Sequence, residues 1–219
     1  IPPSEGYFDL IQPILKKYNI PFIADEVITG FGRTGNLWGS ETYDLKPEII
    51  ISSKCLTAGY FPMGAVIVNK EFAEEFNEIS EQSGEFPHGF TAGGHPVGCA
   101  IALKAIDVII NEGLLENVKT ISPYFHKRLN EFNKYEHIGE TRGKGLMAAL
   151  EMVKNKETKE SFESHLNMGD KIANMALDNG LICRPLGPAI VLCPQFIITK
   201  SQIDDMFDML HDTLKKAFN

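Results

Sequence analysis

Two stretches of this chain carry charged side chains directly after apolar runs. Lys54 follows the run IIISS at residues 49–53, and Asp25 and Glu26 follow the run PFIA at residues 21–24. A lysine amine in a desolvated site can form an imine with a carbonyl compound. An aspartate beside it can hold the protonated nitrogen of a heterocyclic ring. This pairing of amine and carboxylate suggests covalent catalysis on a carbonyl group.

The elements that position these residues are strands of a parallel sheet. Three consecutive isoleucines predict a strand over residues 49–52 that is buried on both faces. A second strand is predicted over residues 21–27 and a third over residues 64–69. Open α/β sheets bind their ligands at the carboxyl ends of strands. We therefore expect Lys54 and Asp25 to face one pocket.

The rest of the chain alternates helices and strands. The spacing of apolar residues predicts helices, and the last of them is expected to begin at Ser201 with Asp204 as its capping-box partner. The helix from residue 95 has little polar face and is expected to be largely buried. Together these elements predict an α/β protein. The predicted helices cover residues 7–18, 71–80, 95–111, 114–132, 169–179 and 201 onward, the later strands residues 145–153, 181–184 and 189–193, and a Gly-rich loop residues 83–94.

Residues 30–35, GFGRTG, match the dinucleotide-binding pattern G-x-G-x-x-G. That pattern requires a helix to begin directly after the glycines. Residues 36–40 show neither an apolar period nor a helix cap. The segment is therefore predicted to be a flexible loop, and the match to be accidental.

Composition limits the possible partners of the chain. Its 219 residues carry a formal net charge of -8 with a pI near 5.3, which argues against nucleic acid as a partner. No apolar run approaches the roughly 20 residues needed to span a bilayer. Cytoplasm is the default expectation, with no membrane partner.

Cysteines and histidines show no metal-binding arrangement. No C-x-x-C or H-E-x-x-H spacing occurs, so no metal site is expected. The cysteines lie among apolar or small residues and are predicted to be buried free thiols. They are Cys55, Cys99, Cys183 and Cys193.

Four ordered motifs carry a family resemblance. They are ADEVITGFGRTG at residues 24–35, ISSKCLTAGYFPMGAV at 51–66, HGFTAGGHP at 88–96 and RPLGPAIVLCP at 184–194. Over essentially the whole chain, the sequence resembles class III aminotransferases that depend on pyridoxal 5'-phosphate (PLP). Within that family it is most similar to ω-transaminases of the amine:pyruvate type.

The resemblance implies the PLP-dependent transferase fold type I. The chain would hold the second half of the large-domain mixed sheet and a C-terminal small α/β domain. The implied boundaries are residues 1–112 for part of the PLP-binding large domain, 113–134 for a linking helix and 135–219 for the small domain.

The resemblance also implies roles for individual residues. Lys54 would be the catalytic residue, linked to PLP as an imine, and Asp25 would bind the pyridinium nitrogen. Val27 would pack against the ring, and Thr91 would reach the phosphate bound by a neighbouring subunit. Arg184 would bind the substrate carboxylate, for which the planar guanidinium is suited.

The implied reaction moves an amino group from an amine or ω-amino acid to pyruvate or another keto acid by a ping-pong mechanism. The implied assembly is a homodimer with shared active sites. One departure is Gln195, where the family commonly has a second proline. The family's phosphate-binding Gly/Ser loop and ring-stacking aromatic residue lie in segments that are missing here, so this partial chain is expected to be inactive alone. Two alternatives remain: another PLP reaction such as an aminomutase or decarboxylase, or a non-catalytic dimerisation or binding fragment.

Overall fold

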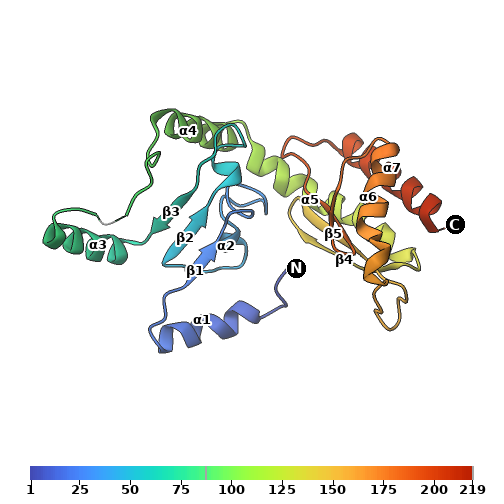
Figure 1. Ribbon diagram of the computed structural model, residues 1–219, viewed down its shortest axis with the longest axis horizontal. Coiled ribbons are helices and arrows are strands. Elements are labelled where there is room, and N and C mark those ends of the chain that lie inside the picture. Colours follow the sequence, from blue (N-terminus) through green and yellow to red (C-terminus); the bar gives the residue numbers. More distant parts are fainter. Residues whose placement is uncertain (87, 219) are drawn as a thin grey trace. The chain divides into compact units, whose positions relative to one another are not determined.

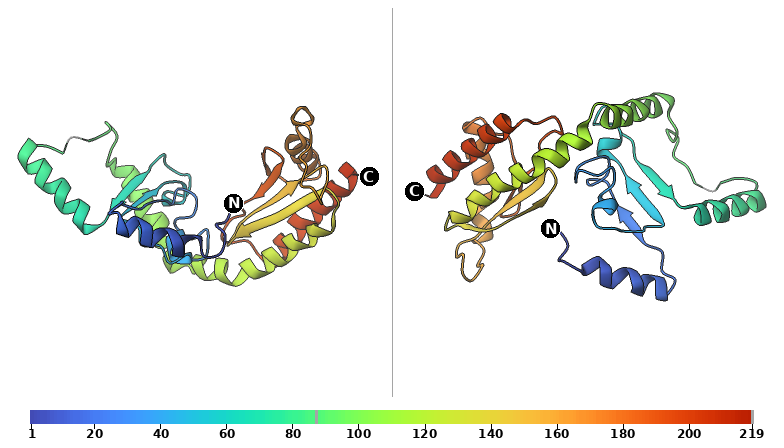
Figure 2. Two further views of the ribbon diagram at one scale, coloured as in Figure 1. Left: turned by 90° about the horizontal axis from the view of Figure 1, so that it is seen from below. Right: turned by 180° about the vertical axis from the view of Figure 1, so that it is seen from behind.

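The computed structural model describes residues 1–86 and 88–218. Its contacts divide the chain into two compact units, Pro3–Leu115 and Glu116–Asn219, the second together with Ile1–Pro2. Each unit contains its own sheet (Figures 1 and 2). In the described residues, no helix has the length and apolar character needed to cross a membrane.

The sheet of the first unit is mixed. β1 (Ile23–Asp25) runs parallel to β2 (Ile49–Ser52), and β3 (Ala65–Val68) pairs with β2 in the antiparallel direction. The Glu26 N–H donates to the carbonyl of Ile51 at 2.8 Å and so extends the β1–β2 ladder by one residue. The strands predicted over residues 21–27, 49–52 and 64–69 are therefore confirmed, with the first and third shorter than expected.

Helices of the first unit match the helical periods of the sequence. They begin and end within a few residues of the predicted limits, and one further short helix, α2, was not predicted. A 3₁₀ turn, η1 (Lys54–Leu56), follows β2 directly. Of the predicted Gly-rich loop, Pro87 lies outside the described residues. The helices are α1 (Tyr7–Lys17), α2 (Gly39–Thr42), α3 (Lys70–Ser83) and α4 (Pro96–Asn111).

The first unit is less buried than its sequence predicts. All three isoleucines of β2 are only half-buried. In α4, Leu103 is 71% exposed, although this helix was expected to be largely buried. Both predictions are wrong for the described unit because its core is small. The buried cluster consists of Phe31, Leu56, Ala102 and Ile109, so most apolar side chains of the sheet and of α4 have no partner within it.

The second unit has a larger apolar core under an antiparallel sheet of order β4-β5-β7-β6. Helix α6 packs on α7 and on the β6–β7 side of this sheet (Figure 1). Phe207 lies 5.4 Å from Phe125 and 5.6 Å from Phe132 between ring centroids. These rings join α5 to α7. The elements are α5 (Leu114–Asn130), η2 (Glu131–Lys134), β4 (Ile138–Lys144), β5 (Met147–Met152), η3 (Ser164–Leu166), α6 (Met168–Asp178), β6 (Arg184–Leu186), β7 (Ala189–Leu192) and α7 (Lys200–Phe218).

Several predictions for the second unit need correction. Strand β4 was not predicted, and β6 begins where the predicted strand over 181–184 was to end. All the cysteines are free as predicted, but none is fully buried: Cys193 is exposed, and Cys55, Cys99 and Cys183 are half-buried. The capping box at the start of α7 is formed by Thr199 and Gln202, since the Thr199 N–H donates to Gln202 Oε1 at 2.9 Å and the Gln202 N–H donates to Thr199 Oγ1 at 3.3 Å.

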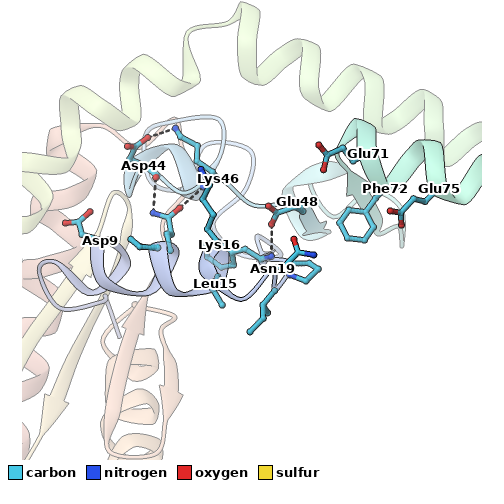
Figure 3. A pocket seen from close by; sticks show the side chains of 15 residues that line it. Asp9, Leu15, Lys16, Asn19, Asp44, Lys46, Glu48, Glu71, Phe72 and Glu75 are labelled. Carbon is cyan, nitrogen blue, oxygen red and sulfur yellow. Dashed lines mark hydrogen bonds and ion pairs between the residues drawn. The ribbon is translucent and has the colours of Figure 1, made fainter.

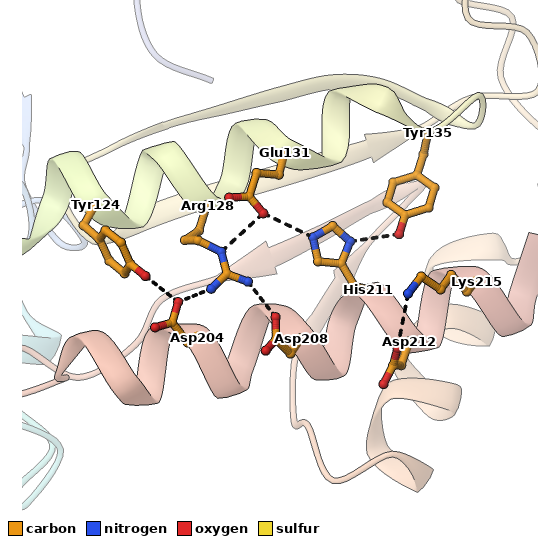
Figure 4. A network of polar contacts seen from close by, with 9 residues as sticks. All are labelled: Tyr124, Arg128, Glu131, Tyr135, Asp204, Asp208, His211, Asp212 and Lys215. Carbon is orange, nitrogen blue, oxygen red and sulfur yellow. Dashed lines mark hydrogen bonds and ion pairs between the residues drawn. The ribbon is translucent and has the colours of Figure 1, made fainter.

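Asp204 does not cap α7 because its carboxylate is used elsewhere. It accepts from the Tyr124 hydroxyl at 2.5 Å and pairs with the Arg128 guanidinium (Figure 4). These hydrogen bonds, from Tyr124 first and then from Arg128, hold the pKa of Asp204 below its usual value. Arg128 also pairs with Asp208 at 2.6 Å and with Glu131 at 3.3 Å. The network links α5 to α7.

His211 is the titratable group at the other end of this network. Its ring stacks on Phe132 at 3.9 Å between centroids, and Nδ1 shares a hydrogen bond of 2.8 Å with the Tyr135 hydroxyl. Burial and the nearby Lys134 and Arg128 lower the pKa of His211, while Glu131, 3.6 Å from Nε2, acts in the opposite direction. The folded state therefore favours the neutral imidazole.

We predict that His211→Gln reduces the pH dependence of stability. Below pH of about 6.5 the unfolded chain binds a proton that folded His211 resists, so the unfolding free energy falls as the pH drops through that value. At pH 7.5 the unfolding free energy of the variant should be about 1 kcal/mol lower than that of the wild type, because the ring stack is lost. Between pH 7.5 and 5.5, however, its unfolding free energy should decline less. Urea unfolding at several pH values measures both effects.

The exposed His165 provides the matched control, since His165→Gln makes the same substitution at a position where no buried ring is lost. Some slope should remain in His211→Gln, because burial also lowers the pKa of His126. An unaltered slope in His211→Gln would contradict the assignment.

Candidate functional site

The ends of β1 and β2 bring two of the predicted site residues to one edge of the sheet. Asp25 is the last residue of β1 and pairs with Ile51 of β2. Lys54 lies three residues beyond Ile51, in the turn η1. Because β1 and β2 are parallel, Asp25 and Lys54 both emerge at the carboxyl edge, where open α/β sheets bind ligands.

Lys54 has a strained backbone. Its φ of 43° lies in the left-handed region, which costs a non-glycine residue roughly 1–2 kcal/mol. Hydrogen bonds on both sides hold the turn: Ser53 Oγ donates to the Met63 carbonyl at 2.9 Å, and Thr57 Oγ1 donates to the Phe61 carbonyl at 2.6 Å. Such strain is found at functional sites that the surrounding structure over-determines. The Lys54 side chain is exposed and forms no ion pair in the described part of the chain.

Asp25 is exposed between two buried neighbours, Ala24 and Glu26. This alternation is that of a strand, whose successive side chains point to opposite faces. Asp25 Oδ1 accepts the Val27 N–H at 3.0 Å, which fixes both residues in an Asx turn. Within residues 1–86 and 88–218, no ammonium or guanidinium group pairs with Asp25. Its carboxylate is available to a cationic ligand.

Glu26 is a buried residue to which the sequence analysis, having placed it beside Asp25 after the apolar run, gave no role at the site. It is 2% exposed, and its carboxylate accepts from Thr29 Oγ1 at 2.5 Å, from the Gly39 N–H at 2.8 Å and from the Ser40 N–H at 2.6 Å. The sequence could have indicated this burial. Side chains alternate along a strand, so a strand that exposes Asp25 turns Glu26 toward the same side as the buried Ala24. The partner amides, 13 and 14 residues further on, could not be identified from local sequence.

The loop between β1 and α2 is packed, which corrects its description as flexible. Phe31 is 4% exposed and lies 4.8 Å from the Trp38 ring. A short helix that was not predicted follows the loop: α2 begins at Gly39, and Glu41 Oε2 accepts the Trp38 N–H at 3.0 Å. Helix α2 is only four residues long and begins four residues after the last glycine of the motif. The motif therefore does not open directly into a helix, as a dinucleotide loop would.

Thr91 and Arg184 lie in other surroundings. Thr91 is exposed in the turn before α4, where the Gly93 N–H donates to the Phe90 carbonyl at 2.8 Å. Arg184 belongs to the second unit, where it is exposed and begins β6 opposite Val191. In the described part of the chain, strand pairing and a hydrogen bond connect Asp25 with Val27 and with β2, the strand that precedes the Lys54 turn. Among the residues that the structure describes, the contacts of this edge do not include Thr91 or Arg184.

A cavity of about 800 Å³ lies elsewhere in the first unit (Figure 3). It is lined by α1, α3 and the residues that precede β1 and β2, among them Phe22 and Glu48, which are joined by a hydrogen bond of 2.7 Å. It therefore lies at the amino ends of the strands, opposite the edge that bears Asp25 and Lys54. Its position does not favour it as the catalytic site.

Comparison with known proteins identifies the family. The model of the family Aminotransferase class-III matches residues 1–214. The chain belongs to this family. Class III aminotransferases use PLP, and solved structures similar to this chain include PMP-bound and PLP-bound aminotransferases. The expected α/β fold of a PLP-dependent transferase is confirmed.

Three relatives illustrate the similarity. The PMP-bound aminotransferase of Vibrio fluvialis is 59% identical to this chain, with a TM-score of 0.97. The match covers 100% of this chain and 48% of the Vibrio chain. The ω-aminotransferase of Paracoccus denitrificans is also 59% identical, with a TM-score of 0.97. That match covers 100% of this chain and 49% of the Paracoccus chain. The putrescine–pyruvate aminotransferase of Pseudomonas aeruginosa is 44% identical over 218 residues, 99% of this chain and 47% of its own. The chain spans about half the length of the curated relatives it matches.

We predict that the backbone strain at Lys54 can be relieved. Glycine adopts a positive φ without steric cost, so Lys54→Gly should be about 1 kcal/mol more stable than Lys54→Ala. At Lys104, in the interior of α4, the order should reverse, since glycine is about 1 kcal/mol worse than alanine inside a helix. Thermal unfolding of the four variants measures the comparison, and the same order at both positions would contradict the strained conformation.

Proposed function

We propose that the protein is a PLP-dependent transaminase of the ω type that moves an amino group from an amine or ω-amino acid to pyruvate. Family membership supports the aminotransferase class. The single observation that carries the proposal is the position of Lys54 and Asp25 at one edge of two parallel strands. The solved ω-aminotransferase at 59% identity supports the ω type.

The residues at this edge fit the cofactor chemically. Lys54 offers an amine without an acidic partner, and Asp25 offers a carboxylate without a cationic one, in the described part of the chain. Lys54 would bind PLP covalently and Asp25 would contact the ring nitrogen. Val27 would contact the ring face, and Thr91 would bind the phosphate of a partner subunit's cofactor. When bound, PLP acts as an electron sink for the charge left by proton loss from the substrate.

The remaining steps, proton transfer and protonation of the ring nitrogen, are assigned to side chains of this protein. The Lys54 Nζ would act as the general base and acid that takes up and returns the proton at the substrate carbon. The Asp25 carboxylate would hold a proton on the ring nitrogen by charge and hydrogen bonding. The Asx turn with Val27 restricts the direction in which that carboxylate points.

Arg184 is proposed to bind the carboxylate of pyruvate or alanine. Its side chain is exposed, and no carboxylate pairs with it within residues 1–86 and 88–218. The guanidinium is therefore available for a bidentate contact with a substrate. Pro185 and Gly187, whose φ is +58°, follow it in the short strand and turn.

We also propose a homodimer in which each subunit contributes to the other's site. Large apolar side chains near the Thr91 and Lys54 turns are exposed, notably Phe90 at 81% and Tyr60 at 83%. Exposed apolar surface of this kind favours association. The domain organisation proposed with this assembly is residues 1–112 for the PLP-binding part, 113–134 for a linking helix and 135–219 for the small domain.

The function is tested on the protein expressed with whatever further sequence its gene encodes. We predict a yellow protein whose visible band disappears with an amine donor and returns with pyruvate as alanine forms. Borohydride reduction followed by peptide mapping should place the pyridoxyl group on Lys54. The variant Lys54→Ala should lose turnover but retain some noncovalent PLP, while Lys70→Ala should behave as wild type.

Other outcomes would support the alternatives. A colourless protein would favour a non-catalytic binding role, and a band that responds to amines without alanine formation would favour an aminomutase or decarboxylase. Label on Lys70 or Lys104 would refute the role of Lys54. A donor panel that includes putrescine and γ-aminobutyrate, which the names of relatives suggest, would identify the amine.

For Arg184→Ala we predict a selective loss. In the half-reactions of pyruvate and alanine, the variant should lose about 1.5–3 kcal/mol of transition-state stabilisation, the value of a charge-assisted contact. The half-reactions of amines without a carboxylate should keep their rates. Arg184→Lys should fall between the two because it keeps the charge but not the planar fork. Stopped-flow measurement of the separate half-reactions tests this. Equal damage to both would show that Arg184 has a structural role.

A further inference from the structure

We propose that Glu26 is a positioning residue whose buried carboxylate closes the loop between β1 and α2 and thereby holds Asp25 and Val27 in place for the cofactor ring. This inference rests on the proposed function, because it assumes that Asp25 and Val27 contact PLP. It adds a residue that does not itself touch the cofactor.

The Glu26 carboxylate joins the two ends of the loop. At the near end it accepts from Thr29 Oγ1 at 2.5 Å, and at the far end from the amides of Gly39 at 2.8 Å and Ser40 at 2.6 Å. All three partners are donors, and no cation pairs with Glu26 in the described part of the chain. Burying a carboxylate costs free energy unless several donors solvate it. The loop must therefore stay closed for the burial to be tolerated.

The backbone of Glu26 ties this closure to the sheet. Its N–H donates to the Ile51 carbonyl of β2 at 2.8 Å, and its carbonyl accepts the Gly30 N–H at 2.9 Å. Strand β2 runs on into the turn that carries Lys54. Glu26 thus contacts the strand before Lys54, the loop and α2 at once.

Glycines in the loop show how little space the closure leaves. A Cβ on Gly39 would lie 2.6 Å from the Thr29 Cβ and 2.8 Å from Glu26 Oε2. A Cβ on Gly30 would lie 2.8 Å from the Glu26 carbonyl oxygen and 3.1 Å from the Trp38 ring. Real Cβ atoms essentially never approach other atoms within 3.0 Å, and at 3.1 Å the Trp38 ring would have to move by a few tenths of an ångström. The backbone approaches Glu26 as closely as only glycine permits.

The closed loop also shares its core with the Lys54 turn. Phe31, at the middle of the loop, and Leu56, two residues after Lys54, belong to one buried cluster, and Trp38 packs against it. If Glu26 lost its partners, Phe31 and the Asx turn of Asp25 with Val27 would lose a common support. The expected result is a displaced Asp25 carboxylate rather than an unfolded unit.

The test uses two variants that disturb the closure from opposite ends. Glu26→Gln keeps the volume but replaces one acceptor oxygen with a donor that would face backbone N–H groups. Gly39→Ala keeps every charge but forces its Cβ against Thr29 and Glu26. The matched control is Glu41→Gln, which removes an exposed carboxylate from the same helix but keeps an amide oxygen that can accept the Trp38 N–H. If Glu26→Gln does not fold, Gly39→Ala and Thr29→Val carry the test.

The first readout needs no cofactor. Amide hydrogen exchange of Gly39 and Ser40 in the apoprotein should accelerate on the order of tenfold in Glu26→Gln and Gly39→Ala, and should be unchanged in Glu41→Gln. Unchanged exchange in both closure variants would overturn the claim that the carboxylate holds the loop.

The second readout reports on Asp25 itself. A protonated ring nitrogen withdraws electrons from the carbon–nitrogen bond to Lys54, so a displaced Asp25 should move the pH midpoint of the visible absorbance upward by about one unit. Both closure variants should show this shift, the double variant should show little more than either alone, and Glu41→Gln should titrate as wild type.

The outcomes separate this inference from the proposed function. If borohydride labels Lys54 in the wild type and the closure variants exchange faster but titrate as wild type, Glu26 is only structural and the inference fails. If the wild type itself is not labelled at Lys54, the proposed function fails, and the exchange experiment still decides whether Glu26 closes the loop.

Discussion

The parallel pairing of β1 with β2 is the constraint on which the candidate site depends. Two parallel strands end at the same edge of the sheet, so Asp25 at the end of β1 and Lys54 shortly after β2 both emerge there. An antiparallel pairing would have placed them at opposite edges. The chain between the strands forms the packed loop and α2, which return the backbone to the start of β2.

The returning loop is stabilised by a buried carboxylate instead of a large apolar core. Glu26 accepts hydrogen bonds from a hydroxyl and two backbone amides, and the glycines beside it allow the backbone to approach. Around it the apolar cluster of the first unit is small. Polar closure of this kind is directional, unlike hydrophobic contact. It restricts the orientation of the exposed Asp25, which stands between two buried residues.

The two units are stabilised in different ways. The second unit has a continuous aromatic and aliphatic core of α5, α7 and the sheet, with the Arg128 network at its border. In the first unit, strand and helix residues that are apolar in sequence remain half-buried or exposed. The chain spans about half the length of its curated relatives, and the proposed dimer would cover part of this surface.

The sequence alone located most of the elements and placed Asp25 and Lys54 at the ends of two strands. Apolar periodicity located α1, α3, α4 and the strands before Asp25 and Lys54, because the period of side-chain directions is a local property of the backbone. Only the tertiary structure decided how Glu26 and Asp204 are used. Glu26 is bound by amides 13 and 14 residues away, and Asp204 is drawn from its expected cap by Tyr124 and Arg128, some 80 residues earlier. Burial likewise could not be predicted for the isoleucines of β2, because exposure depends on what packs against a strand rather than on the strand itself.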